Sequence, residues 1–310
     1  MSQVYDTVII GAGPAGLTAG IYAARFGLQA LILEKLAVGG QIILSSTIEN
    51  YPGFPGGIST FELMDKFKTQ VEQLNIKIEE KQVRGIEVEE KSNSRVYRLQ
   101  LPDTYLQTKT VIVASGAQPK KLGIKGEDEF IGKGVSYCGT CDAPFFRDKE
   151  IVVVGGGDRA IEEAIFLSHY ARKVTIVHRR NELRAAKILI KKTQNNPKIN
   201  FVFDSVVEEI QGENNVRSVL IKNVKTNSQT TLSCAGVFIF VGIQPNTGFL
   251  KNFLEMDKLG FIITDDKMQT SKVGIFACGD CRKKDFYQVI TACAEGAIAA
   301  NSCHKYLMDE

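Results

Sequence analysis

The sequence predicts an α/β fold with two domains. Apolar strands alternate along the chain with Ala-rich helical segments, as in parallel sheets covered by helices. The length of 310 residues exceeds the usual range of roughly 100–200 residues for one domain. A hydrophobic content of 44% is ordinary for a globular protein, and a net charge of +3 is too small to indicate a nucleic-acid partner.

Runs rich in Val and Ile carry the strand prediction. Unbroken apolar runs of this kind suit strands that are buried on both faces of a parallel sheet. Residues 77–109 alternate polar and apolar side chains instead, so we expect an antiparallel hairpin or a three-stranded meander there. The predicted buried strands are Thr7–Ile10, Ala30–Leu33, Thr110–Val113, Ile151–Val154, Val174–Val177, Val237–Phe240 and Gly274–Cys278.

The chain also contains an internal repeat. Gly11-Ala-Gly13 and Gly155-Gly-Gly157 lie 144 positions apart, and each follows an apolar strand and opens an Ala-rich helix. Each copy later reaches a Gly-x-Gln-Pro segment, at Gly116–Pro119 and at Gly242–Pro245. Ordinary turns would explain either segment alone, but their duplication favours two crossings between domains. We expect two Rossmann-like, three-layer nucleotide-binding domains, the second inserted into the first: 1–116 with 245–310, and 117–244.

The first glycine motif predicts a site for a dinucleotide. In Gly11–Gly16, the first Gly makes a tight turn, the second lets the backbone approach a pyrophosphate, and the third lets helix and strand pack closely. Glu34 ends the next strand 21 residues after Gly13, where a carboxylate accepts hydrogen bonds from a ribose. A tight turn without a ligand is the alternative interpretation.

Two segments near the C-terminus favour FAD over NAD in this first site. Gly279-Asp280 follows a strand, and a carboxylate there can bond the ribityl chain of a flavin. Gln288 opens the final Ala-rich helix and would meet the flavin ring. Alone, this segment would be an ordinary strand–helix unit; its combination with the first glycine motif indicates FAD.

The second glycine motif differs in the residues that follow it. The position 21 residues after Gly157 is His178, so the acidic ribose ligand is missing. The strand ends His178-Arg179-Arg180, with Arg184 one helical turn further, and guanidinium groups suit a 2′-phosphate. NADPH is therefore favoured over NADH. A solvated basic helix face, continued by Lys187, Lys191 and Lys192, is the alternative.

Arg159 is unexpected at the second glycine turn. A small side chain normally lets the pyrophosphate approach there. Arg159 either pairs with a phosphate or obstructs it, and the sequence leaves both open.

Cys138-Gly-Thr-Cys141 lies just before the second glycine-rich strand. Cysteines with this spacing at a helix start close a disulfide with little strain and have thiols of lowered pKa. Zinc would need two more ligands, and inert buried thiols are the other alternative. Asp142 could act as a general acid or as a helix N-cap, and one side chain can do both.

The N-terminal sequence and the remaining cysteines indicate the cellular compartment of the protein. The chain enters an apolar strand at Val4, and no apolar run approaches the roughly 18 residues that span a bilayer. We expect a cytoplasmic protein, where structural disulfides are rare. Most of the seven cysteines should be buried, and we interpret Cys278 and Cys281 as packing beside the flavin.

Taken together, these motifs resemble those of the low-molecular-weight thioredoxin reductases of bacteria and archaea. These are FAD-containing pyridine nucleotide-disulphide oxidoreductases, and the resemblance runs through essentially all 310 residues in order. The combination is specific, although no single motif is. The motifs are Gly11–Gly16, Gly39-Gly-Gln41, Glu49–Gly53, Cys138–Asp142, Gly155–Ala160, His178–Arg180 with Arg184, Gly279-Asp280 and Gln288.

The resemblance implies two sets of cofactor contacts. The FAD contacts would come from Gly11, Gly13, Pro14, Ala15, Gly16, Glu34, Gly40, Gln41, Asn50, Ala114, Gly116, Gly279, Asp280, Gln288 and Val289. The NADPH contacts would come from Gly155, Gly157, Asp158, Arg159, Ala160, His178, Arg179, Arg180 and Arg184.

The resemblance also implies a route for electrons in a homodimer. Hydride would pass from NADPH to FAD, then to the Cys138–Cys141 disulfide, and by thiol–disulfide exchange to a thioredoxin-like protein on a separate chain. The inserted domain would rotate on the two Gly-x-Gln-Pro hinges during each cycle. By analogy with the family, Cys141 lies nearer the flavin, and which cysteine first attacks the substrate stays open.

Two departures from the family pattern leave other functions open. Arg159 replaces a small hydroxyl or amide residue, and Tyr287 replaces Arg before Gln288. Reduced ferredoxin or a deazaflavin could be the donor, although such relatives tend to lose the basic cluster that this chain keeps. A dithiol oxidase on the same fold and a non-enzymatic flavin-binding regulator are further alternatives. A glutathione-reductase-like enzyme fits poorly, because His304 has no Glu beside it.

Overall fold

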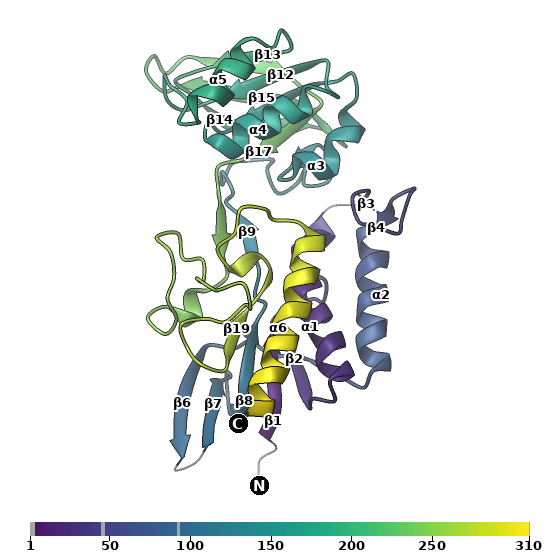
Figure 1. Cartoon of the computed structure of the whole chain (residues 1–310). Helices are drawn as coiled ribbons and strands as arrows, with labels where there is room; N and C mark the ends of the chain where they lie inside the picture. The colour runs from purple at the N-terminus through teal and green to yellow at the C-terminus, as the bar shows by residue number, and fades with distance from the viewer. Residues whose placement is uncertain (1–3, 45–46, 92–93, 310) are drawn as a thin grey trace. The chain divides into compact units, whose positions relative to one another are not determined.

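The computed structural model describes residues 4–44, 47–91 and 94–309. The chain divides into two compact units, Met1–Gln118 with Gln244–Glu310 and Pro119–Ile243 (Figure 1). The second unit is continuous in sequence and is inserted into the first. Among the described residues, no helix has the length and apolar character that crossing a membrane would require.

The first unit is built on a seven-stranded sheet in the order β5-β2-β1-β8-β7-β6, with β19 also paired to β8. The strands β5, β2, β1, β8 and β19 run parallel, whereas β8, β7 and β6 form an antiparallel meander. The bounds are β1 Val4–Ile10, β2 Ala30–Glu34, β5 Lys77–Glu80, β6 Gly85–Lys91, β7 Ser94–Gln100, β8 Tyr105–Val113 and β19 Ile275–Ala277.

Strand β8 belongs to both parts of this sheet. On one side it pairs with β1 along most of its length. On the other side, Tyr105–Thr108 pairs with β7 and Val111–Val113 pairs with β19. The meander predicted within residues 77–109 is therefore confirmed for β6, β7 and β8. Including residues 77–80 in it was wrong, because β5 pairs in parallel with β2 and belongs to the nucleotide-binding sheet.

Alternate residues of the central strands pack on opposite faces of the sheet. Ile9, Ile32 and Ile112 face a core that contains Leu17 of helix α1 (Pro14–Arg25). Val8, Leu31 and Val111 face a second core with Tyr97 and Leu99 from the meander. Burial on both faces explains why these strands read as unbroken apolar runs in the sequence.

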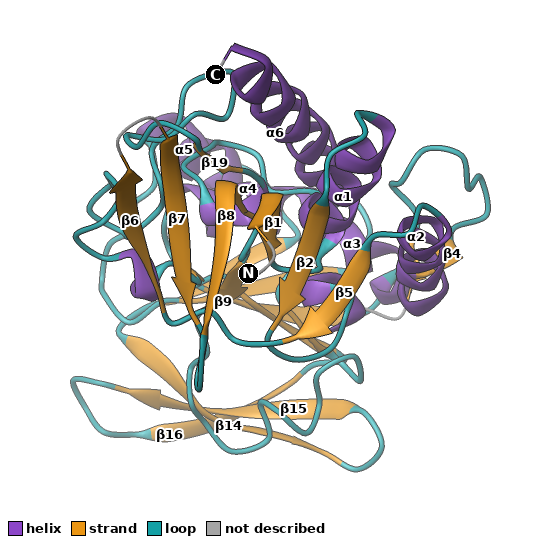
Figure 2. Ribbon diagram, turned by 90° about the horizontal axis from the view of Figure 1, so that it is seen from below, coloured by secondary structure: helices purple, strands orange, loops and turns teal. Residues whose placement is uncertain are grey.

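Helices α1 and α6 (Val289–Asp309) lie side by side against this sheet (Figures 1 and 2). Small residues let them approach: a Cβ added to Gly296 of α6 would overlap the backbone of Ala15 in α1. The remaining elements of the unit are α2 Thr60–Gln73, β3 Thr47–Ile48, β4 Ile58–Ser59 and the 3₁₀ turns Gly40–Leu44, Gly248–Leu250 and Gly279–Cys281.

The inserted unit contains a five-stranded parallel sheet in the order β10-β17-β11-β12-β13. One face packs on helices, and the other packs on a three-stranded antiparallel sheet, β14-β15-β16, that the sequence analysis did not identify. The bounds are β10 Val135–Ser136, α3 Gly139–Asp142, β11 Glu150–Val154, α4 Asp158–Leu167, β12 Lys173–Val177, α5 Lys187–Gln194, β13 Ile199–Val202, β14 Ser205–Gly212, β15 Val216–Asn223, β16 Gln229–Ser233 and β17 Gly236–Ile239; Ala143–Phe146 is a 3₁₀ turn.

The two links between the units are strands that pair with each other. β9 (Ala117–Pro119) and β18 (Ile243–Pro245) form a two-stranded sheet. Each follows a glycine with positive φ, 66° at Gly116 and 123° at Gly242, a conformation that L side chains rarely adopt. The assignment of each unit to a particular cofactor stays a prediction.

Candidate functional site

The turn between β1 and α1 is shaped by its glycines. Gly11 has φ 111°, and a Cβ at Gly16 would overlap the carbonyl of Gly11. A Cβ at Gly13 would meet nothing closer than 3.8 Å, and Gly13 starts α1 without a side-chain cap. Pro14 at the first helical position and buried Ala15 complete the turn. Open space at an uncapped helix N-terminus fits a phosphate group.

Glu34 is held beside this turn by backbone N–H groups. One carboxylate oxygen accepts a hydrogen bond from Ala12 N at 2.8 Å. The other accepts from Lys35 N at 2.8 Å and from Leu36 N at 3.1 Å. The carboxylate therefore has a fixed place at the end of β2, next to the glycine turn.

The segment that carries Gly40 and Gln41 lies over the same turn. Gly39 N donates to Ala12 O at 2.9 Å, and a Cβ at Gly40 would lie 3.2 Å from Gly13 Cα. Buried Ala114 closes the other side, because a Cβ at Gly11 would overlap its backbone oxygen.

The segment Gly279-Asp280 meets helix α1 from the other end of the chain. A Cβ on Gly279 would lie 2.8 Å from Ala15 Cβ. Gly279 N donates to the buried Glu295 carboxylate at 2.8 Å, and Asp280 pairs with Lys284 at 2.9 Å. Two segments that are far apart in sequence thus meet at one turn.

Glu295 is a buried carboxylate beside Gly279 that the sequence analysis did not single out. It lies in α6 and is 8% exposed, and Arg282 Nη1 donates to it at 2.9 Å. Lys284 Nζ lies 3.4 Å from its other oxygen. The sequence feature that could have identified Glu295 is a carboxylate among the small residues of the Ala-rich part of α6. This ion-pair cluster fixes the backbone that carries Asp280.

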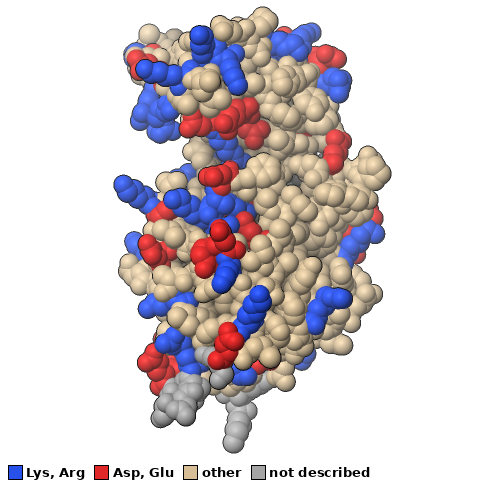
Figure 3. All heavy atoms as spheres, in the orientation of Figure 1, with Lys and Arg blue, Asp and Glu red and all other residues tan. Residues whose placement is uncertain are grey.

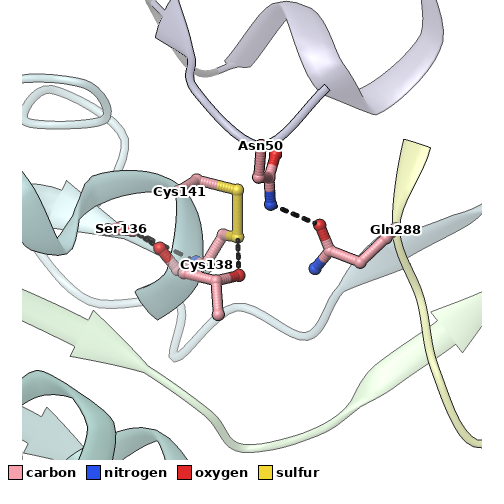
Figure 4. Close-up of a disulfide and its surroundings, with 6 residues drawn as sticks. Asn50, Ser136, Cys138, Cys141 and Gln288 are labelled. Carbon is pink, nitrogen blue, oxygen red and sulfur yellow. Dashed lines mark hydrogen bonds between the residues drawn. A yellow bond between two sulfur atoms is a disulfide. The ribbon is translucent and has the colours of Figure 1, made fainter. Parts of the chain in front are cut away.

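Asn50 and Gln288 are brought together across 238 positions of sequence. Asn50 Nδ2 donates to Gln288 Oε1 at 3.0 Å (Figure 4). Gln288 precedes Val289, the first residue of α6. Tyr287, which departs from the family pattern, packs against Phe261 with 5.8 Å between ring centroids.

The second glycine turn, between β11 and α4, repeats the geometry of the first. Gly155 has φ 152°, and a Cβ there would lie 2.7 Å from Cβ of buried Ala160. Gly157 starts α4 without a side-chain cap, and a Cβ on it would meet nothing within 4 Å. This open, uncapped turn also fits a phosphate.

His178 packs on this turn as a neutral ring. It is 5% exposed, and a Cβ at Gly156 would overlap its imidazole. Burial, and then the charge of Arg184, hold the pKa of His178 below its ordinary value of 6.5. Because the ring is neutral at pH 7, any attraction for a 2′-phosphate must come from the neighbouring guanidinium groups.

Those guanidinium groups stand on an exposed loop. Arg179, Arg180 and Arg184 are exposed, and Figure 3 shows Lys and Arg side chains on the visible face of this unit. Residues 178–186 are not helical, so placing Arg184 one helical turn further was wrong. The loop is tied to the glycine turn instead: Arg184 N donates to Gly156 O, and Ala186 N donates to Asp158, both at 2.7 Å.

Arg159 is the second residue of α4 and is exposed. Its guanidinium carbon lies 5.9 Å from the centre of the Phe240 ring. The side chain therefore extends beside the turn, over the residue that follows β17.

Cys138 and Cys141 form a disulfide, with 5.3 Å between their Cα atoms (Figure 4). Ser136 Oγ accepts from Cys138 N at 3.1 Å and lies 3.2 Å from Cys138 O, to which it donates. Thr140 Oγ1 lies 3.4 Å from Cys138 Sγ. Both cysteines are half-buried at the start of α3. Such a pair can accept two electrons and exchange with another disulfide.

Asp142 is the carboxyl next to the disulfide in sequence. Burial raises its pKa, and a hydrogen bond with Ser136 partly offsets that effect. Asp142 occupies the N-cap position of the following 3₁₀ turn but makes no capping hydrogen bond with its side chain. A carboxyl that holds its proton more tightly suits a general acid.

The other five cysteines are buried free thiols: Cys234, Cys278, Cys281, Cys293 and Cys303. Burial raises the pKa of each one, to about 11 at Cys281 and about 12 at Cys234. Cys281 Sγ donates to the carbonyls of Val113 and Cys278. Thiols in this state are poor nucleophiles, so the prediction that Cys278 and Cys281 serve packing is confirmed as to their burial.

The sequence pattern of the pyridine nucleotide-disulphide oxidoreductases matches residues 5–296. The thioredoxin reductase of Treponema pallidum is 44% identical over 99% of this chain and 98% of its own length, and that of Peptoclostridium litorale is 45% identical over the same shares. The chain belongs to the thioredoxin reductase family.

Solved structures agree with this assignment. The thioredoxin reductase of Streptococcus pyogenes superposes with a TM-score of 0.93 at 47% identity, and covers the whole of both chains. That of Giardia duodenalis superposes with a TM-score of 0.90 at 36% identity, over 99% of this chain and all of its own. The chain thus belongs to a family of flavin- and nicotinamide-dependent oxidoreductases and has its two-domain Rossmann-type fold.

Proposed function

We propose that the protein is an NADPH-dependent thioredoxin-disulfide reductase that holds FAD in its discontinuous unit. The observation that carries the proposal is the Cys138–Cys141 disulfide, which lies in the same unit as the open glycine turn at Gly155–Gly157. An oxidised pair and a pyridine-nucleotide turn in one inserted unit are what a disulfide reductase of this family needs.

The FAD would lie along the β1–α1 turn. The uncapped helix N-terminus at Gly13 would bind the pyrophosphate, and Glu34 would accept hydrogen bonds from the adenosine ribose. Asp280 would bond the ribityl chain, and Asn50 and Gln288 would approach the ring system. Bound there, FAD would carry two electrons between nicotinamide and disulfide.

NADPH would lie on the β11–α4 turn. Gly157 leaves room for its pyrophosphate, and Arg179, Arg180 and Arg184 would bind the 2′-phosphate. Arg184 is the best placed of the three, because its backbone is hydrogen-bonded to the turn itself.

The chain's own residues then complete the exchange. Reduction breaks the S–S bond and leaves one thiol and one thiolate, and Asp142 supplies the proton. That thiolate attacks the disulfide of a thioredoxin-like partner, whose S–S bond breaks, so that a mixed disulfide forms and one partner sulfur leaves as a thiolate that takes up the proton of the remaining thiol. The second cysteine attacks that bond, releases the reduced partner and restores the Cys138–Cys141 disulfide.

The proposal includes a cytoplasmic homodimer in which the inserted unit rotates on its two links. The positive φ angles of Gly116 and Gly242, at the start of the paired strands β9 and β18, support a hinge at these positions. Rotation would present the disulfide and the nicotinamide to FAD in turn.

The donor is tested by anaerobic mixing of the purified protein with NADPH, NADH, reduced ferredoxin or a reduced deazaflavin. Bleaching of the flavin absorbance by NADPH, followed by reoxidation with a thioredoxin disulfide, is expected. Bleaching by another donor alone would replace the donor assignment. The exposed Arg159 at the nucleotide turn is the observation that favours that second candidate.

A further inference from the structure

Gly139, between the two redox cysteines, is a glycine for reasons of space. Its backbone is helical in α3 and does not have the positive φ that favours glycine. A Cβ at this position would overlap the carboxylate of Glu163, which lies one turn into α4. Glu163 therefore occupies the place where residue 139 of the redox turn would otherwise carry a side chain.

One carboxyl oxygen of Glu163 is buried, although the side chain as a whole is half-buried. Oε2 has no solvent exposure and no hydrogen-bond partner among the residues that the structure describes. Burial raises the pKa of Glu163, the guanidinium of Arg159 lowers it, and Glu162 raises it. Burying a carboxylate oxygen without a hydrogen-bond partner costs stability, so its presence at this contact indicates a role beyond packing.

Other ionisable groups surround this carboxyl. Helix α3, which packs against α4, carries Cys141 and Asp142, and Cys138 is its N-cap residue. The further elements that pack on α4 carry Lys187, Lys191 and Lys192 on α5, Lys173 on β12 and Glu150 on β11. Arg159 is the cation that acts on Glu163 most strongly, and it lies one helical turn away on the same helix.

We propose that Glu163 is a positioning residue of the redox turn, whose carboxyl supports Gly139 and whose charge governs how readily the reduced cysteines form a thiolate. When the disulfide accepts two electrons and one proton, the S–S bond breaks and one sulfur carries a negative charge. A second negative charge on Glu163 opposes that thiolate, and a protonated Glu163 does not. Ionisation of Glu163 therefore makes ionisation of the thiol less favourable, and the pKa of the thiol is higher when Glu163 is charged.

The inference rests on the proposed function only in taking Cys138 and Cys141 as the working pair. Its test needs neither NADPH nor an acceptor protein, so a wrong donor assignment would leave the result unchanged. The protein is reduced with dithiothreitol, desalted under argon and alkylated with iodoacetamide from about pH 6 to 9, where thiols titrate. Peptide mass spectrometry then reports Cys138 and Cys141 separately from the five buried thiols.

Glu163→Gln keeps the shape of the side chain and removes its charge. We expect the faster-reacting cysteine of this variant to alkylate about threefold faster than in the unaltered protein at pH 8, with its midpoint at lower pH. Glu213→Gln, on the exposed turn between β14 and β15 of the same unit, is the matched control and should match the unaltered protein. Identical pH profiles for Glu163→Gln and the control would overturn the proposal.

The contact itself has a separate test that does not depend on thiol chemistry. Gly139→Ala should lower the midpoint of thermal unfolding by several degrees, because the methyl group overlaps the carboxyl. In a Glu163→Ala background the same change should leave the midpoint where it is. An equal loss in both backgrounds would show that Glu163 does not occupy this space.

Discussion

At the scale of single residues, burial separates the working cysteines from the rest. Cys138 and Cys141 are half-buried and bonded to each other, whereas the other five cysteines are buried thiols with raised pKa values. The spacing Cys-x-x-Cys occurs twice, at Cys138 and at Cys278, and does not distinguish the two pairs. Burial does, and it depends on tertiary packing that the spacing does not encode.

Replacing one working cysteine should separate the two halves of the reaction. In Cys141→Ser we expect NADPH to bleach the flavin as before and turnover of a thioredoxin disulfide to be lost, because no disulfide can form in the variant. Cys234→Ala is the control, and anaerobic spectroscopy combined with a steady-state assay gives both readouts. Persisting turnover in Cys141→Ser would rule out the pair as the relay.

The buried His178 predicts a pH dependence of stability. Its folded pKa lies below the unfolded value of about 6.5, so its contribution is fully present above that value and is lost as pH falls toward the folded pKa. His178→Gln should therefore lose less stability than the unaltered protein between about pH 7 and 5. Thermal midpoints at both pH values test this, with the exposed His169→Gln as control. Equal losses in all three proteins would contradict it.

The loop arginines predict a preference between nicotinamide cofactors. Arg184→Ala should raise the KM for NADPH by about tenfold and change the KM for NADH little, because one charge-assisted hydrogen bond to the 2′-phosphate is lost. Lys191→Ala, on the exposed face of α5, separates this effect from general loss of positive charge. A similar change in both variants would favour the solvated basic face.

At the scale of elements, the sequence predicted the doubly buried strands and the meander but not the second antiparallel sheet, β14–β16. The strands β1, β2, β11, β12 and β17 are buried on both faces, so their composition alone identifies them. In β14–β16 the buried residues alternate with polar ones and a bulge interrupts the register, which hides the pattern. β5 was misplaced because pairing with β2 is a long-range choice that four residues do not reveal.

The residues of the candidate site also divide into those that the sequence predicts and those that it does not. Glycines with positive φ or close backbone neighbours leave a sequence signature, and Gly11, Gly16 and Gly155 were found from it. Glu163 and Glu295 lie against Gly139 and Gly279, which are remote from them in sequence. A carboxylate on a predicted helix is normally expected to be exposed to solvent. Charged residues are almost never fully buried unless paired. Glu295 is buried because Arg282 and Lys284 pair with it. Glu163 is half-buried, with one buried oxygen.

The contact between α1 and α6 predicts that Gly296 tolerates no side chain. Gly296→Ala should lower stability by about 1–3 kcal/mol and reduce the FAD content, because α1 must move away and carries the first glycine turn with it. Gly248→Ala is the control, since a Cβ there meets nothing within 4 Å. Chemical denaturation and the ratio of flavin to protein absorbance measure both effects. Full FAD content with unchanged stability would contradict the packing argument.

At the scale of the whole molecule, the inserted unit has its own sheets and cores and is continuous in sequence. We therefore expect residues 119–243 produced alone to unfold cooperatively and to form the Cys138–Cys141 disulfide. Calorimetry and mass spectrometry of the oxidised fragment test this, with the Cys141→Ser fragment as control. A fragment without a thermal transition would show that the unit depends on the rest of the chain.

The position of β8 has a consequence for synthesis on the ribosome. β8 pairs with β19 along Val111–Val113 of one edge, and β19 and α6 emerge only after the whole insertion has been made. Until then the N-terminal strands have an open edge and an uncovered apolar face, whereas the insertion already holds every strand of its own sheets. The unit that begins second along the chain is therefore expected to fold first, and the unit that begins first completes its sheet only when the last strand and helix have left the ribosome.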